Sequence, residues 1–381
     1  MYKKNFIITI LTFSVYICAQ ADIEIRYLKP PRLEEENILK HVVCHRPMRL
    51  EKPRIEQEQY NNKIIIHNYG HASGGWTMGP GSAQYAVNLL PEIPYDTPIT
   101  VIGAGVIGLF TAYQLIKTGY TNITLIAESF DNLTSHKAGG LFAYMSTNPD
   151  DNIRNFINNL AIESYKVYAT IAEHKHPDFS AGARYLPAYF TSRESSDLEA
   201  YVGIVMRPAR DVTVDFQNGT QRQMVVYDDG IFMDTIKLIQ ELHIFLHSKQ
   251  VTFIQQHVTS FDSVDSDIIF NCSALGAKSL ASNDSGAIYP AQGHLLMLKN
   301  QDPSELQYMI ELVLNRGITH DGFEICRCCY FFPKQLADAK ADEIGVLGGT
   351  FIKYADNTTP HLEEFDTVLA NARKFFTEPN D

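Results

Sequence analysis

Three glycines spaced as G-x-G-x-x-G mark the part of this sequence best suited to hold a dinucleotide. They lie in the stretch Gly103-Ala104-Gly105-Val106-Ile107-Gly108, directly after the apolar run 99–102 and directly before a helical pattern. The first glycine permits a tight turn, the second lets backbone approach a pyrophosphate, and the third lets helix pack on strand. Free N–H groups and the dipole at the helix N-terminus favour the diphosphate charge. The stretch therefore predicts a dinucleotide site.

An acidic residue follows where such folds hold the adenosine ribose. Glu128 ends the next apolar strand, "TLIAE", and a carboxylate there accepts hydrogen bonds from ribose hydroxyls. The glycine motif alone does not separate FAD from NAD. Two further segments favour flavin: "TSHKAGGLFAY" at 134–144, close behind the acid, and "IIFNCSALGA" at 268–277, a strand ending in a small-residue turn. The first segment contains Thr134, Ser135, Ala138, Gly139, Gly140 and Leu141.

The elements that position these residues belong to a large globular chain. Its 381 residues, 45% of them hydrophobic, can bury cores for two or three domains. A net charge of −12 argues against nucleic acid as a partner, because nucleic-acid binders concentrate Lys and Arg on one face. The sequence leaves the oligomeric state open.

The first residues have the pattern of a secretory signal. Two lysines precede an apolar run at 6–18, and the small-x-small sequence Ala19-Gln20-Ala21 follows. We expect cleavage after Ala21, giving a signal peptide of residues 1–21 and a secreted or periplasmic protein without stable membrane insertion. The alternative is an uncleaved anchor, although the run is shorter than the roughly 20 residues that a spanning helix needs. No second ligand pair stands at zinc-site spacing from "CRCC" at 326–329, so no metal is expected.

Strand and helix patterns alternate around residue 100 and give way to short strands later. The run 63–68, "KIIIHN", predicts a buried strand, 81–90 predicts a helix, and 363–376 predicts a closing helix. This order favours an α/β fold in which a Rossmann-like domain is joined to a second, antiparallel-sheet domain. The expected dinucleotide domain comprises residues 61–150 and 233–290. The expected substrate domain comprises residues 22–60, 151–232 and 291–376.

At this point the sequence resembles the D-amino acid oxidase family of FAD enzymes. In that family a "TS…AAGL" segment follows the ribose acid and contacts flavin, and a strand similar to "IIFNCSALGA" closes the nucleotide site. The stretch "AQGH" at 291–294 resembles a family "RGQ" signature, and "LGGT" at 347–350 matches another. The resemblance implies a flavoprotein that oxidises a D-amino acid to an imino acid, with oxygen reduced to hydrogen peroxide.

One family motif stands in an unexpected place. The family's "IHNYGHGGxGxT" comes near the C-terminus, whereas "IHNYGHASGGWT" stands here at 66–77, before the glycine turn. We therefore expect a circular permutation of the family fold, which is physically reasonable because chain termini often lie close together at the surface. The turn departs from the family at Ala72 and Ser73, and His67 and His71 are expected to support the site rather than act as bases. The resemblance places Ser73, Gly74, Gly75, Trp76 and Thr77 against the flavin.

The same resemblance assigns the substrate site. The family's "G-x-R-P-x-R" matches "CHRPMR", which gives Arg46 the substrate carboxylate and makes Arg49 a structural arginine. A planar guanidinium holds a carboxylate with two parallel hydrogen bonds. The family tyrosine of "YIIP" corresponds to Tyr330 in "YFFP", and a second tyrosine of many animal members corresponds to Cys326. We expect Arg46 and Tyr330 to face one cavity beside the 74–77 turn.

Two other functions remain open from the sequence. A flavin oxidase of glycine or sarcosine type would use the same fold on another small amine. A catalytically silent protein that keeps the fold is favoured by Cys326, the altered turn and the export signal. Selectivity for an acidic substrate would need a cation in the side-chain pocket, for which Arg184, Arg193 and Arg207 are unplaced candidates.

Overall fold

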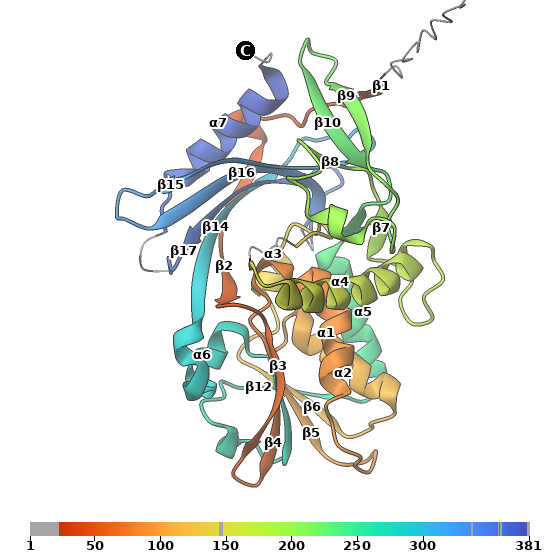
Figure 1. Cartoon of the computed structure of the whole chain (residues 1–381), viewed down its shortest axis with the longest axis vertical. Coiled ribbons are helices and arrows are strands. Elements are labelled where there is room, and N and C mark those ends of the chain that lie inside the picture. The colour runs from red at the N-terminus through yellow and green to blue at the C-terminus, as the bar shows by residue number, and fades with distance from the viewer. Residues whose placement is uncertain (1–22, 145–147, 337, 357, 359, 379–381) are drawn as a thin grey trace, which may run out of the picture.

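The computed structural model describes residues 23–378 except 145–147, 337, 357 and 359, so the predicted signal peptide lies outside it. Two sheets dominate this part of the chain, the smaller below the larger in Figure 1. The observed architecture is α/β with a second sheet domain, as the sequence predicts.

The smaller sheet has six strands and carries the glycine turn. Its strands lie in the order β12-β6-β5-β13-β4-β3, all parallel except the edge strand β3. Runs such as "IIIH" and "ITVI" are apolar on both faces, which is typical of parallel strands covered on both sides. The strands are β3 (Arg54–Tyr60), β4 (Lys63–Tyr69), β5 (Ile99–Ile102), β6 (Ile123–Ala127), β12 (Thr252–Gln255) and β13 (Ile268–Asn271).

Helices cover one face of this sheet, and a short apolar loop covers the other. The helices are α1 (Gly75–Val87), α2 (Val106–Thr118) and α5 (Thr235–Ser248), whose buried side chains share one core with the strands. On the opposite face Ile65, Ile102, Ile126 and Ile269 pack against the loop residues Val258 and Phe261. The glycine turn between β5 and α2 is therefore held at the carboxyl end of a buried strand.

The strand before the glycine turn in sequence joins the same sheet. Strand β4 pairs in parallel with β13, and β13 pairs in parallel with β5. Helix α1 then follows β4 and lies beside α2 in Figure 1. The stretch 63–87 thus supplies a strand and a helix to the dinucleotide domain although it precedes the domain's glycine motif.

The larger sheet has nine strands in the order β1-β9-β10-β8-β15-β16-β17-β14-β2. It is mainly antiparallel, with parallel pairs β1·β9 and β8·β15. Helix α7 (Glu364–Thr377) packs against it through Phe365, Leu369 and Phe376. The strands are β1 (Glu24–Tyr27), β2 (Ile38–Arg49), β8 (Ala188–Phe190), β9 (Arg210–Asp215), β10 (Gln221–Tyr227), β14 (Ile288–Leu298), β15 (Met309–Ile318), β16 (Glu324–Gln335) and β17 (Ile344–Lys353).

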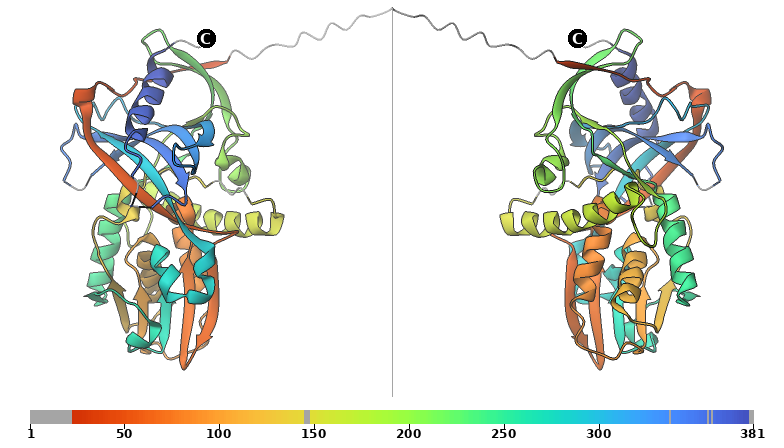
Figure 2. Two further views of the ribbon diagram at one scale, coloured as in Figure 1. Left: turned by 90° about the vertical axis from the view of Figure 1, so that its left-hand side faces the viewer. Right: turned by 90° about the vertical axis from the view of Figure 1, so that its right-hand side faces the viewer.

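Short elements and one long helix connect the sheets. The long pair β2 and β14 runs from the larger sheet down towards the smaller one in Figure 2. The remaining elements are the pair β7 (Ala183–Tyr185) and β11 (Ile231–Met233), the helices α3 (Thr134–Lys137), α4 (Asp151–Ala172) and α6 (Ala277–Leu280), and the 3-10 turns η1 (Glu35–Asn37), η2 (Ala72–Gly74), η3 (Asp197–Tyr201), η4 (Phe261–Ser263), η5 (Ala274–Gly276) and η6 (Ser282–Ala287).

The structure corrects two predicted boundaries. A domain division at residue 60 would cut a hairpin, because β3 pairs with β4 along its whole length across the turn at Asn61, whose φ is 50°. Residues 54–60 therefore belong to the dinucleotide domain. The helix expected at 81–90 begins earlier, at Gly75, so Trp76 and Thr77 form its first turn.

Helix α4 packs against the dinucleotide domain although the sequence groups it with the substrate domain. The Gly81 N–H donates to Ser164 Oγ at 2.9 Å, and Tyr168 Oη donates to the Trp76 carbonyl at 2.7 Å. A Cβ on Gly81 would lie 2.1 Å from the Leu160 carbonyl oxygen, so the two helices approach backbone to backbone. This close packing fixes α1, and with it the 73–77 segment.

Candidate active site

A cavity of about 1310 Å³ lies between the two sheets. Its wall includes the glycine turn from the smaller sheet and Arg46, Tyr330 and Cys326 from the larger one. The predicted cofactor segment and the predicted substrate residues therefore share one space. This volume exceeds that of ordinary small-ligand pockets and suits a dinucleotide with a substrate beside it.

The glycine turn has the close packing that its spacing predicts. A Cβ on Gly103 would lie 2.4 Å from the Cys272 carbonyl oxygen, and a Cβ on Gly108 would lie 1.8 Å from the Gly103 carbonyl oxygen. Gly103 also has a φ of 108°, which favours glycine. Gly105 differs, because its Cβ would meet only Ser135 Oγ, at 3.2 Å, on the cavity side. Backbone at Gly105 is thus bare towards the cavity, as a pyrophosphate requires.

Ser135 ties the cavity wall together. Its Oγ accepts from the Val106 N–H at 3.0 Å, at the first residue of α2, and its carbonyl accepts from Trp76 Nε1 at 3.0 Å. Thr134 Oγ1 donates to the His45 carbonyl at 3.0 Å, which links this segment to the neighbour of Arg46 on β2. The cofactor segment and the substrate strand are therefore mutually positioned by direct hydrogen bonds.

Most predicted cofactor residues line the cavity, and three lie behind its wall. Gly108 supports the α2 turn, Gly74 packs against the Tyr144 ring, and the Thr77 hydroxyl donates to the Ala143 carbonyl at 2.8 Å. Gly74 and Thr77, which the resemblance places against the flavin, are thus not part of the cavity lining: the Gly74 N–H donates to the His71 carbonyl, and the Thr77 hydroxyl is bonded to Ala143. The residues that line the cavity are Ser73, Gly75, Trp76, Gly103, Ala104, Gly105, Val106, Ile107, Glu128, Thr134, Ser135, Ala138, Gly139, Gly140 and Leu141.

Glu128 lies at the rim of the same cavity. It follows β6 directly, and its carboxylate lies 3.4 Å from His257 Nδ1 with both side chains mostly exposed. An exposed pair of this kind contributes little to stability. The carboxylate therefore stays accessible to a ligand hydroxyl, as the ribose assignment requires.

Buried polar atoms beside the cavity lack a protein partner in the described part of the chain. They include His71 Nε2, Asn68 Oδ1 and His45 Nε2; all three residues border the cavity, but these atoms themselves are buried behind its surface. Burial lowers the pKa of His71 to about 3, so its imidazole is neutral at physiological pH. Buried polar groups in native proteins almost always find a partner. The bare Gly105 backbone and the accessible Glu128 carboxylate are the features of this wall that fit a large polar cofactor such as FAD.

Arg46 and Tyr330 converge from strands that are far apart in sequence. The strand order β2-β14-β17-β16 places Arg46 on β2 and Tyr330 on β16. Arg46 Nη1 reaches across β14 to donate to the Thr350 carbonyl on β17 at 3.1 Å. Tyr330 lies opposite Gly348 on β17, so both side chains lie above the same glycine-rich strand.

Two glycines make room for these side chains. A Cβ on Gly293 would lie 2.3 Å from Arg46 Nη1, and a Cβ on Gly348 would lie 1.9 Å from Tyr330 Cζ. Burial raises the pKa of the Tyr330 phenol, although Arg46 opposes the shift, and the ring stacks on Phe332 at 4.9 Å. Tyr330 is therefore a fixed, protonated hydroxyl beside the guanidinium.

Cys326, which the sequence resemblance equates with a tyrosine, lies at the cavity wall. It alternates with Cys328 and Tyr330 along β16, so all three face the cavity. A hydrogen bond with the Cys328 thiol lowers the pKa of Cys326, and Arg316 lowers it further. The wall at this point is a small polar thiol instead of an aromatic ring.

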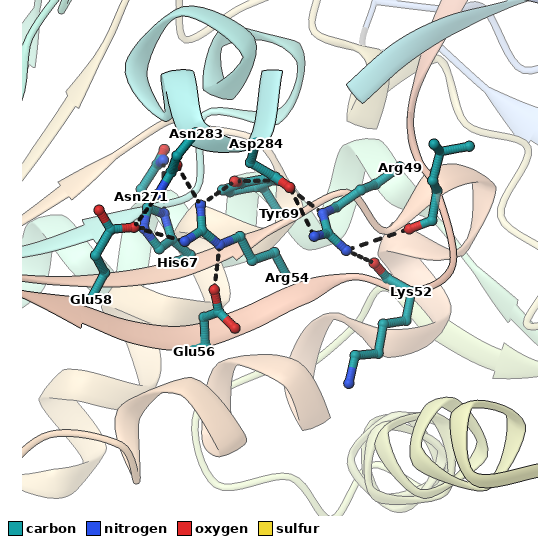
Figure 3. Close-up of polar contacts among 11 residues, drawn as sticks. Arg49, Lys52, Arg54, Glu56, Glu58, His67, Tyr69, Asn271, Asn283 and Asp284 are labelled. Carbon is teal, nitrogen blue, oxygen red and sulfur yellow. Dashed lines mark hydrogen bonds and ion pairs between the residues drawn. The ribbon is translucent and has the colours of Figure 1, made fainter. Parts of the chain in front are cut away.

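Arg49 holds the end of the substrate strand against the dinucleotide domain. It donates to both carboxylate oxygens of Asp284 at 2.9 Å, and Asp284 also accepts from Tyr69 Oη at 2.7 Å (Figure 3). Arg54 then donates to Tyr69 Oη at 3.1 Å and to Glu58 at 2.7 Å. The geometry matches the structural role expected for Arg49.

His67 belongs to the far end of the same network. Its Nε2 lies 3.0 Å from Glu58, and its Nδ1 lies 3.2 Å from Asn271 Nδ2 (Figure 3). Burial lowers the pKa of His67 to about 4, and the Arg54 charge acts in the same direction. His67 thus supports the fold behind the cavity, whereas His71 borders the cavity itself.

Two acidic residues of the cavity wall, Glu311 and Asp197, are not predicted from the sequence. Glu311 stands in the apolar strand "MIELVL", and that isolated acid was the available signal. The three arginines considered for a side-chain pocket lie elsewhere. Arg184 stacks over Phe232 at 5.1 Å, Arg193 pairs with Asp211 at 2.8 Å, and Arg207 lies 3.4 Å from Asp229.

Comparisons with known proteins agree with this geometry. Residues 98–381 match the family model "FAD dependent oxidoreductase" (DAO), so the chain belongs to that family and is an FAD-dependent amine oxidoreductase. It is 26% identical over 280 residues to a D-amino-acid oxidase of Dictyostelium discoideum, covering 71% of this chain and 70% of the relative. A D-amino-acid oxidase of Schizosaccharomyces pombe is 23% identical over 244 residues, covering 59% and 68%.

The fold is similar to that of solved flavoenzymes. Glycine oxidase from Bacillus cereus superposes with a TM-score of 0.53 at 15% identity, covering 73% of this chain and 79% of the other. An L-proline dehydrogenase from P. horikoshii gives 0.50 at 13% identity, covering 74% and 77%. At these identities the likeness shows the fold alone. In the described residues, no helix is long and apolar enough to cross a bilayer.

Proposed function

We propose that this protein oxidises a D-amino acid to an imino acid, which water converts to a 2-oxo acid and ammonia, while oxygen is reduced to hydrogen peroxide. The observation that carries the proposal is the convergence of Arg46 and Tyr330 in the cavity that the glycine turn borders. Bound FAD supplies the oxidising centre that accepts a hydride from the substrate carbon.

The chain's own residues bind and orient the substrate. Arg46 keeps guanidinium N–H groups beyond its bond to Thr350, and these can hold the substrate carboxylate with two parallel bonds. Tyr330, fixed beside it, offers a hydroxyl to the same carboxylate. A substrate held at both points presents its α-carbon in one orientation, which is the main contribution a protein makes to hydride transfer.

The D configuration is supported by the two D-amino-acid oxidase relatives. The alternative substrates are glycine or sarcosine, since glycine oxidase has a similar fold. Those substrates lack a side chain to fill the space towards Glu311 and Asp197, so a longer D-amino acid fits the cavity better.

The test is peroxide release from the purified holoprotein with separate D-amino acids, their L-enantiomers, glycine and sarcosine. The proposal expects peroxide with at least one D-amino acid and none with its enantiomer. Turnover confined to glycine or sarcosine would replace it with the alternative, and turnover with none of them would leave a flavin protein without this activity.

We also propose export and a circular permutation. The signal pattern at 1–21 supports export, and N-terminal sequencing of secreted protein should begin at Asp22. Strand β4 precedes the glycine turn in sequence, yet it pairs in parallel with β13 in the same sheet, and this pairing supports the permutation. A chain engineered to begin near residue 98 and to carry residues 23–90 at its C-terminus should still fold and bind FAD.

A further inference from the structure

Two carboxyl groups in the cavity have no function in the proposed binding of the substrate carboxylate by Arg46 and Tyr330. Glu311 lies on β15 directly opposite Tyr330 on β16, and directly opposed residues of antiparallel strands project to the same face. Asp197 begins the turn η3 (Asp197–Tyr201) and borders the same cavity. Both acids therefore face the space where a substrate would lie.

Neither acid has a directly bonded partner. Within the residues that the structure describes, no side chain forms a hydrogen bond or ion pair with Glu311 or Asp197. Burial raises the pKa of Glu311 to about 7, against the lowering effect of Arg46. Burial raises the pKa of Asp197 to about 8, and Glu311 raises it further. Both acids are half-buried, and half-buried acids without hydrogen-bond partners cost free energy, which is characteristic of functional sites.

Arg46, Glu311 and Asp197 all line the cavity and influence one another electrostatically. The Arg46 charge lowers the pKa of Glu311, and Glu311 raises the pKa of Asp197. No cation has a resolved effect on the pKa of Asp197. Asp197 in turn raises the pKa values of Tyr144 and Tyr201, whose main cause is burial. A substrate whose carboxylate is bound by Arg46 would thus extend past Glu311, with Asp197 farther along its side chain.

We infer that the cavity selects amino acids whose side chains end in a cation, such as D-lysine or D-arginine, with Glu311 and Asp197 holding the side-chain charge while Arg46 holds the carboxylate. The inference rests on the proposed function and adds its substrate class. It opposes the acidic selectivity that Arg184, Arg193 or Arg207 would have given, because those residues lie outside the cavity wall. A bound cation would also keep both acids ionised.

The experiment compares D-lysine with D-norleucine, which has a side chain of similar length without the terminal charge. The holoenzyme is expected to show a higher kcat/KM for D-lysine by about tenfold or more, as one charged hydrogen bond would give. Glu311→Gln and Asp197→Asn should each reduce that preference while keeping turnover of D-norleucine. Glu324→Gln is the matched control, because Glu324 borders the cavity but pairs with Lys353 at 3.6 Å.

The outcomes separate the inference from the function beneath it. Oxidation of D-norleucine as fast as D-lysine, unaffected by either substitution, would overturn the inference and leave the proposed function intact. An equal loss for both substrates in Glu311→Gln would place Glu311 on the α-ammonium and overturn its assignment to the side chain. If no D-amino acid is oxidised, the proposed function and the inference both fail. Flavin content and melting temperature verify that the variants fold.

Discussion

The Arg46→Lys substitution tests most specifically whether Arg46 holds the substrate carboxylate with two parallel hydrogen bonds. Lysine keeps the positive charge but presents a point charge instead of a planar fork. Arg46 already donates one N–H to the Thr350 carbonyl at 3.1 Å, and the remaining donors are those available to a carboxylate. The substitution therefore removes one of the two parallel bonds proposed for the substrate and retains the general electrostatics of the cavity.

The expected loss follows from the strength of one charged hydrogen bond. Such a bond contributes about 1.5–3 kcal/mol, so kcat/KM should fall about 10- to 150-fold. Steady-state peroxide release with the preferred D-amino acid measures this fall, and flavin absorbance should stay unchanged because the glycine turn is untouched. The loss should appear mainly as a raised KM, because the guanidinium holds the carboxylate of the bound substrate as well as that of the transition state.

Arg184→Lys is the matched control, since Arg184 stacks on Phe232 away from the cavity wall. It should change kcat/KM by less than about twofold, as expected for a surface substitution. If Arg46→Lys had the same small effect while binding FAD normally, the carboxylate would not be held by this arginine, and the proposed substrate orientation would be wrong.

Three further predictions follow from the packing and the buried network. Gly293→Ala should displace the Arg46 guanidinium, since its Cβ would lie 2.3 Å from Nη1. Loss of one charged hydrogen bond to the substrate carboxylate should lower kcat/KM about 10- to 150-fold without loss of flavin, and unchanged kinetics would contradict the close fit. Ala72 has a φ of 55°, a region that favours glycine, so Ala72→Gly should raise the free energy of unfolding by about 0.5–1 kcal/mol in denaturant titrations, whereas destabilisation would show that the methyl group packs favourably. Because the folded pKa of His67, about 4, lies below its unfolded value, stability is full above about pH 6.5 and should be lost by up to about 3 kcal/mol as pH falls towards 4. The lowered pKa of Glu58 acts in the same direction, and a His67→Gln variant with an equally steep pH profile of melting temperature would argue against this cause.

The sequence predicts the dinucleotide half of the molecule well because its signals are local. The spacing of Gly103, Gly105 and Gly108 is a direct consequence of backbone contacts, and the structure shows the two close approaches that such spacing implies. The runs at 64–66 and 99–102 place apolar residues on both faces of their strands, so these strands are recognisable without tertiary information.

The predictions that missed depend on contacts between distant segments. The edge strand β3 alternates polar residues, as in "EQEQ", and only its pairing with β4 assigns it to a domain. Gly74 and Thr77 lie in a motif that resembles a flavin contact, yet packing with Tyr144 and Ala143 places them behind the wall.

Glu311 could not be assigned from its sequence neighbours. Its importance comes from its register opposite Tyr330, which a β-bulge-containing pair of strands determines. From the sequence, only the family resemblance predicts that Arg46 and Tyr330 share a cavity. In the structure, the strand order β2-β14-β17-β16 brings them together.

The most direct test of the central claim is the visible spectrum of the purified protein during anaerobic titration with D-amino acids. We predict an oxidised flavin spectrum that is bleached by at least one D-amino acid and returns when oxygen is admitted, while the L-enantiomer has no effect. A flavin spectrum that no D-amino acid bleaches, in protein that binds FAD fully, would contradict the account.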